Sequence, residues 1–91
     1  MAMIRITPLE VQVRTDWFDG RPRRIRIDQA TVPIVAVESV RREAAAHPPE
    51  TGPRTLFRVR TPEARYALSY EHHRRRWLVE ALELRPQRAA A

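Results

Sequence analysis

The stretch TLFRVRTPEARYALSY, residues 55–70, decides the fold class. Apolar and polar residues alternate through its first half, which is the pattern of a strand with one buried face and one solvated face. A Pro-Glu-Ala connection at 62–64 follows, and the alternation then resumes. We expect these two strands to pair antiparallel, with Phe57 and Val59 on the buried face.

Similar patterns predict the rest of a sheet. Residues 8–14 and 23–28 alternate on either side of a turn that contains Asp-Gly, which is a hairpin signal. The run 32–42 is rich in β-branched residues and predicts a longer strand that bends in its middle, and 76–82 predict the last strand. The sequence therefore predicts an all-β fold: a small antiparallel barrel or bent sheet of about six strands, SH3-like or OB-like in size.

The length of 91 residues favours a single domain. We assign it to residues 8–84, with a short N-terminal segment at 1–7 and a frayed tail at 85–91. The connection at 43–53 is long for a compact domain, which indicates mobility or a function. No run of about 18 apolar residues occurs, so we expect no membrane span, and a cytoplasmic location.

Composition excludes several kinds of chemistry. The chain has no cysteine, which rules out disulfides, thiolate metal sites and thiol nucleophiles. It has two glycines, no phosphate-binding glycine loop and no nucleophile elbow, so we expect no enzyme, no catalytic residue and no cofactor. His72 and His73 are adjacent in a predicted turn and point apart, and His47 is the third imidazole. We therefore expect no metal site.

Positive charge is the strongest functional signal. All 17 cationic side chains are arginine, and the net charge is +6. Each arginine carries a permanently charged, planar guanidinium group whose N–H donors suit bidentate contact with phosphate. Several arginines fall at outward positions of predicted strands, and a curved sheet would display them on its convex surface. The predicted nucleic-acid-binding residues are Arg24, Arg26, Arg58 and Arg60 on strands, with Arg14 at the same parity, and Arg74, Arg75 and Arg76 at a turn.

Two features allow more than one interpretation. The turn with Arg74, Arg75 and Arg76 is either a phosphate-contacting tip or a solvated turn that keeps sheet edges from aggregating. Trp17 and Phe18 lie in a charged turn. They either fold under to close the end of the barrel, or remain exposed as a stacking platform for bases or an anchor for a partner protein.

Several short segments resemble a small bacterial domain family whose members occur alone or at the C-terminal end of Y-family-polymerase-like subunits in error-prone repair. These segments include VQV at 11–13, VAVESVR at 35–41, RTLFRVRT at 54–61 and RWLVE at 76–80. Where that family is expected to carry an aromatic residue after Gly-Arg-Pro, this chain has isoleucines. The resemblance implies a DNA-repair context, with contact to DNA or to a polymerase-related partner, and it implies no reaction.

The sequence therefore favours a non-catalytic basic β module that binds nucleic acid, with DNA preferred over RNA because of the repair context. The alternative is a protein-interaction module that docks a repair or replication partner through an open edge, the 43–53 loop, Trp17 and Phe18. A homodimer through the same edge is a third hypothesis.

Overall fold

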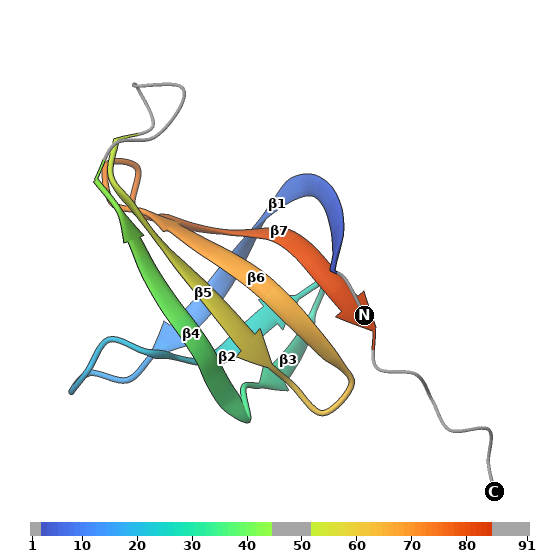
Figure 1. Cartoon of the computed structure of the whole chain (residues 1–91). Coiled ribbons are helices and arrows are strands. Elements are labelled where there is room, and N and C mark those ends of the chain that lie inside the picture. The colour runs from blue at the N-terminus through green and yellow to red at the C-terminus, as the bar shows by residue number, and fades with distance from the viewer. Residues whose placement is uncertain (1–2, 45–51, 85–91) are drawn as a thin grey trace, which may run out of the picture.

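The computed structural model describes residues 3–44 and 52–84, and these residues form one antiparallel sheet of seven strands (Figure 1). The order across the sheet is β3-β2-β1-β7-β6-β5-β4, so β1 joins the two halves of the molecule. The strands are β1 (Ile4–Thr15), β2 (Pro22–Ile27), β3 (Ala30–Pro33), β4 (Ala36–Glu43), β5 (Arg54–Arg60), β6 (Ala64–Glu71) and β7 (Arg76–Leu84).

The all-β bent sheet expected from the sequence is confirmed, with two differences in its strands. β1 begins at Ile4, so most of the segment assigned to 1–7 belongs to the sheet. The single strand expected at 32–42 is divided into β3 and β4 by Ile34 and Val35. The tail expected at 85–91, and most of the 43–53 loop, lie outside the described residues.

Ile34 and Val35 divide the strand because their backbone closes one end of the curled sheet. The Ile34 amide donates to the carbonyl of Arg23 in β2 at 2.8 Å, and the Val35 amide donates to the carbonyl of Arg60 in β5 at 2.7 Å. These two bonds tie opposite halves of the sheet together across a two-residue link. The periodicity of the sequence cannot predict this closure, because the closure depends on hydrogen bonds to strands that are distant in the sequence.

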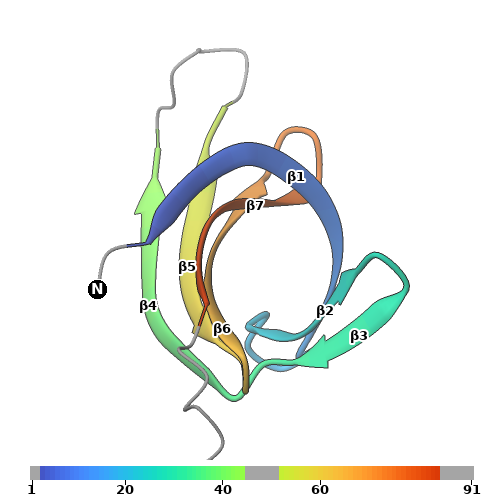
Figure 2. The same ribbon diagram turned by 90° about the vertical axis from the view of Figure 1, so that its right-hand side faces the viewer.

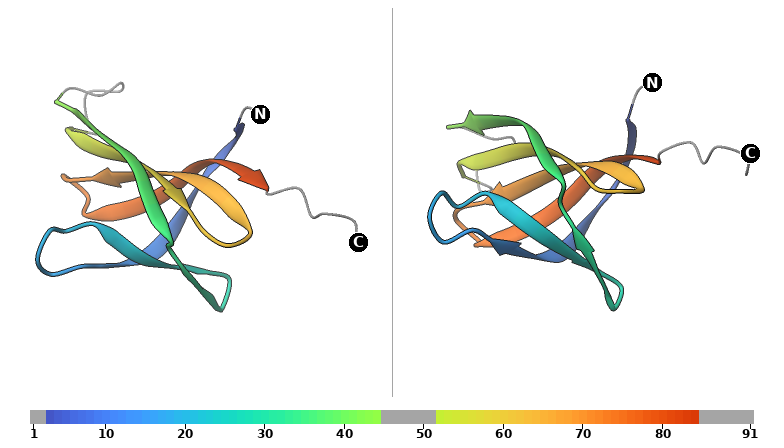
Figure 3. Two further views of the ribbon diagram at one scale, coloured as in Figure 1. Left: turned by 60° about the horizontal axis from the view of Figure 1, so that its bottom comes forward. Right: turned by 90° about the horizontal axis from the view of Figure 1, so that it is seen from below.

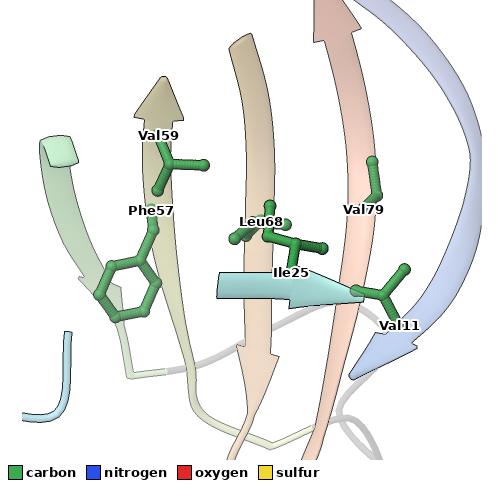
Figure 4. Close-up of a cluster of buried hydrophobic side chains, with 6 residues drawn as sticks. All are labelled: Val11, Ile25, Phe57, Val59, Leu68 and Val79. Atoms are coloured by element: carbon green, nitrogen blue, oxygen red, sulfur yellow. The ribbon is translucent and has the colours of Figure 1, made fainter. Parts of the chain in front are cut away.

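The core lies on the concave side of the sheet (Figure 4). Ile25, Val59 and Leu68 are fully buried there, and Val11, Phe57 and Val79 complete the cluster. The inward parity expected for Ile25, Phe57 and Val59 is confirmed. Burying each of these side chains contributes about 1.5–3 kcal/mol of transfer free energy.

The sheet is closed at one end and open at the other. β1 arches over the interior (Figure 2), and its pairing with β7 is irregular between Arg5 and Leu9, on either side of Pro8. The β1–β2 turn and the β6–β7 turn lie at the same end of the sheet (Figure 3), and the β1–β2 turn stands apart from the β6–β7 turn and the end of β4 (Figure 1). A cleft between the β1–β2 hairpin and the inner surface of β4–β7 lies at this end.

Candidate nucleic-acid interface

Three arginines on the outer face of β4–β7 are matched by glutamates. Arg54 donates from Nε to Glu43 Oε1 at 2.7 Å and from Nη1 to Glu80 Oε2 at 2.8 Å. Ser69 Oγ donates to the same Glu80 oxygen at 3.0 Å. The bond from Arg54 is the main cause that lowers the pKa of Glu43 below its usual range. Together these side chains form a network across four strands.

The same face holds two further arginines in ion pairs. Arg76 donates to Glu71, which is buried, and its Nη1 lies 3.8 Å from Glu10 Oε1. Arg65 lies 3.5 Å from both Glu38 and Glu83. Arg76, which the sequence placed in a phosphate-contacting tip, is thus part of a structural pair.

The remaining residues of the β6–β7 turn are exposed. Arg74 and Arg75 lie in this four-residue turn, where Arg75 has a left-handed φ of 53°, and neither makes an ion pair with a described residue. His72 is bonded to Thr55, with Nε2 and Oγ1 2.8 Å apart, and its ring meets the edge of Tyr70. Residues 3–44 and 52–84 contain no group of three metal-binding side chains, and His47 lies outside them.

The outer face of β1–β3 is different, because its arginines have no acidic partner within residues 3–44 and 52–84. Arg14 of β1 is directly opposite Arg24 of β2, and Arg26 is opposite Gln12. All three arginines are exposed, and none pairs with an acid in the part of the chain that the structure describes. They surround a hollow of about 380 Å³, here called the arginine hollow, which is lined by Gln12, Val13, Arg14, Arg24, Arg26 and Thr31.

Arg58 and Arg60 form a second group on β5. Both are exposed and neither pairs with a described acid. In the sheet, β5 is separated from β2 by β1, β7 and β6. Arg58 and Arg60 are therefore not cross-strand neighbours of Arg24 and Arg26, and Arg76 differs from both groups because it is ion-paired with Glu71.

A cleft on the concave side, at the open end, was not recognised in the sequence. It has a volume of about 550 Å³ and lies between the β1–β2 hairpin and the inner surface of β4–β7. Tyr70 and Trp77 lie on the same concave face as Phe57, and the three rings are in contact. The alternation of apolar and polar residues in the sequence could not show that the sheet stays open beside these two rings. We call this the aromatic cleft; its lining includes Phe57, Tyr70, His72 and Trp77, together with Arg21 and Arg42.

Trp17 and Phe18 project from the β1–β2 turn with 85% and 82% of their surfaces exposed. Their ring centroids are 4.1 Å apart. Asp16 holds the turn: its Oδ1 accepts the Phe18 amide at 2.8 Å and its Oδ2 accepts Arg23 at 2.9 Å. The Phe18 amide and Arg23 both lower the pKa of Asp16. In the structure, therefore, Trp17 and Phe18 remain exposed and do not fold under to close the end of the barrel.

Comparison with protein-family models, curated proteins and solved structures found no match. The resemblance to the error-prone repair family thus remains a prediction. No helix among the described residues has the length and apolar character needed to span a membrane. Function has to be inferred from the surfaces themselves.

Proposed function

We propose that this protein is a non-catalytic module that binds nucleic acid, and that the arginine hollow is its main contact with phosphate. The observation that carries the proposal is the placement of three exposed arginines around one hollow without an acidic partner among the described residues. On the outer face of β4–β7, by contrast, Arg54, Arg65 and Arg76 lie against glutamates.

The hollow has an electrostatic cost that a polyanion would relieve. Like charges directly opposite each other in a sheet are destabilising, and Arg14 and Arg24 occupy such positions. Bound phosphates would convert this repulsion into charge-assisted hydrogen bonds, for which the guanidinium fork is well shaped. The net charge of +6 would add attraction at longer range.

Binding of this kind is independent of base sequence. Arginines on a convex strand surface reach phosphates, and phosphate contacts set position and affinity without reading bases. The preference for DNA and the connection with repair rest on the family resemblance alone.

The test is a titration of labelled single-stranded and double-stranded DNA at two salt concentrations, followed by fluorescence anisotropy. We expect affinity to fall steeply as salt rises. Each phosphate contact should add about 0.7–0.9 to the magnitude of the slope of log affinity against log salt concentration. For the variant Arg24→Gln in the arginine hollow, Arg65→Gln is the matched control, because it removes the same charge from a paired arginine. Absence of binding at low salt, or a flat salt response, rules the proposal out.

A second candidate function is docking of a protein partner through Trp17 and Phe18. The specific observation is the exposure of two large adjacent rings at a hairpin tip, because aromatic residues, tryptophan among them, are enriched among the residues that carry most of the binding energy of an interface. The double variant Trp17→Ala/Phe18→Ala should abolish capture of a repair or replication partner and retain DNA binding. Loss of DNA binding with partner capture intact would exclude this role.

A further inference from the structure

The aromatic cleft contains a continuous series of four rings. The centroids of Phe57 and Trp77 are 5.3 Å apart, those of Trp77 and Tyr70 are 4.9 Å apart, and Tyr70 meets His72 edge to face at 4.9 Å. Phe57 is buried against the core, whereas Tyr70 and Trp77 are half-buried and line the open space. The rings of Tyr70 and Trp77 therefore present surface to a ligand at the end of the core where side chains do not fill the interior.

The cleft remains open because the sheet does not close between β4 and the β1–β2 hairpin. On the β4 wall, Val40 is an apolar side chain on the concave side that is still 45% exposed. The volume of about 550 Å³ is within the range of about 300–1,000 Å³ that is typical of ligand pockets. Such a space suits a few planar rings and is too small for a double helix.

Charge at the cleft favours an anionic ligand. Arg42 shares the inward parity of Val40, opposite Thr55, and Arg21 lies on the hairpin wall. Neither arginine pairs with a described acid. Asp19, the acidic residue of the lining, accepts the backbone amide of Arg21 at 2.9 Å. Exposed Arg74 and Arg75 extend the positive charge to the adjacent turn.

We propose that the aromatic cleft binds unpaired bases of a single-stranded nucleic acid, with Arg21 and Arg42 contacting the phosphates beside them. This inference rests on the proposed function and specifies its ligand. Every base has a π-face, so stacking on Trp77 and Tyr70 would tolerate any sequence. In a duplex these faces are already stacked, so paired bases have no access to the rings.

The first test compares two probes that carry the same phosphates. Decathymidylate and a fully abasic decamer are titrated into the intact protein at one salt concentration, with a ten-base-pair duplex as the third ligand. Because base–aromatic stacking contributes about 1–3 kcal/mol per base, decathymidylate should bind about tenfold more tightly than the abasic decamer. The indole N–H signal of Trp77, assigned with the variant Trp17→Phe, should shift with decathymidylate and stay in place with the abasic decamer.

The outcomes separate this inference from the proposed function. Equal affinity for the two decamers with an unmoved Trp77 signal overturns the cleft assignment and leaves the arginine hollow intact. Tighter binding of the duplex than of decathymidylate also overturns it. Failure of all three ligands to bind at low salt overturns the proposed function itself.

A pair of neighbouring variants gives a second test that spares the core. Arg42→Gln removes a charge from the cleft, whereas Arg41→Gln removes the same charge from the outer face, where Arg41 lies 3.2 Å from Glu43. We expect Arg42→Gln to weaken decathymidylate about fivefold and Arg41→Gln to weaken it less than twofold. Equal losses would contradict a phosphate contact inside the cleft.

Discussion

Two outer surfaces of one sheet carry arginines, and they differ in what those arginines contact. On β4–β7, Arg54, Arg65 and Arg76 each lie within ion-pair distance of at least one glutamate, whereas Arg58 and Arg60 have no acidic partner among the described residues. On β1–β3, Arg14 and Arg24 face each other, and Arg26 faces a glutamine. The comparison teaches that net charge alone does not locate a polyanion site. An arginine whose charge is already matched holds strands together, and arginines without a described acidic partner that surround one hollow are available to a single ligand.

The largest expected effect is on the paired face. Arg54→Leu would leave Glu43 and Glu80 without their main cation in a partly buried network. The free energy of unfolding should fall by about 2 kcal/mol, as expected for losing hydrogen bonds to charged groups. Urea denaturation of the parent chain and of the variant measures this change in the free energy of unfolding.

The control for this change is Arg26→Leu on β2, where the arginine has no described acidic partner. Its effect on stability should stay within about 0.5 kcal/mol. Equal destabilisation by both substitutions would remove the distinction between the two surfaces.

A smaller effect of opposite sign is expected on the unpaired face. Arg24→Glu places a carboxylate directly opposite Arg14, which converts a repulsive cross-strand pair into an attractive one. The free energy of unfolding should rise by about 0.5 kcal/mol, within the range of cross-strand pairs. Binding of nucleic acid should weaken in the same variant. A protein that is both less stable and unchanged in binding would refute the role given to Arg24.

The smallest effect concerns acid. Hydrogen bonding to Arg54 holds the pKa of Glu43 below its ordinary value of 4.5, so the folded state binds this proton less readily than the unfolded state. The contribution of the Glu43–Arg54 pair to the free energy of unfolding is therefore fully present above pH 4.5, and it is lost as the pH falls through the lowered pKa of Glu43. Urea denaturation at pH 7 and pH 3 should show a smaller drop for Glu43→Gln than for the parent chain. An identical drop would mean that Glu43 does not contribute to acid sensitivity.

The sequence predicts the strands and their buried faces because alternation has a period of two. Ile25, Phe57 and Val59 are buried as that period requires. Alternation cannot predict which outward arginine meets a glutamate, because this depends on register between strands. Glu43 is opposite Arg54, and Glu71 is opposite Arg76, only in the pairing that the folded sheet adopts.

The candidate site was less predictable for the same reason. The exposed arginines of β2 were identified from parity, but their hollow requires the pairing of β1 with β2. The aromatic cleft requires in addition that Ile34 and Val35 close one end of the sheet and leave the other end open. Both are properties of contacts between distant residues, and no local pattern encodes them.

The most direct test compares two double variants, each of which changes two exposed arginines that have no acidic partner among the described residues. Arg24→Gln/Arg26→Gln changes the arginine hollow, and Arg58→Gln/Arg60→Gln removes the same charge from the second group on β5. The measurement is the slope of log affinity against log salt concentration for single-stranded DNA. We predict that the first variant lowers the magnitude of the slope by about 1.4, from two contacts of about 0.7 each, and that the second leaves it nearly unchanged. Equal reductions in both variants would contradict the account, because binding would then follow total charge and not the arginine hollow.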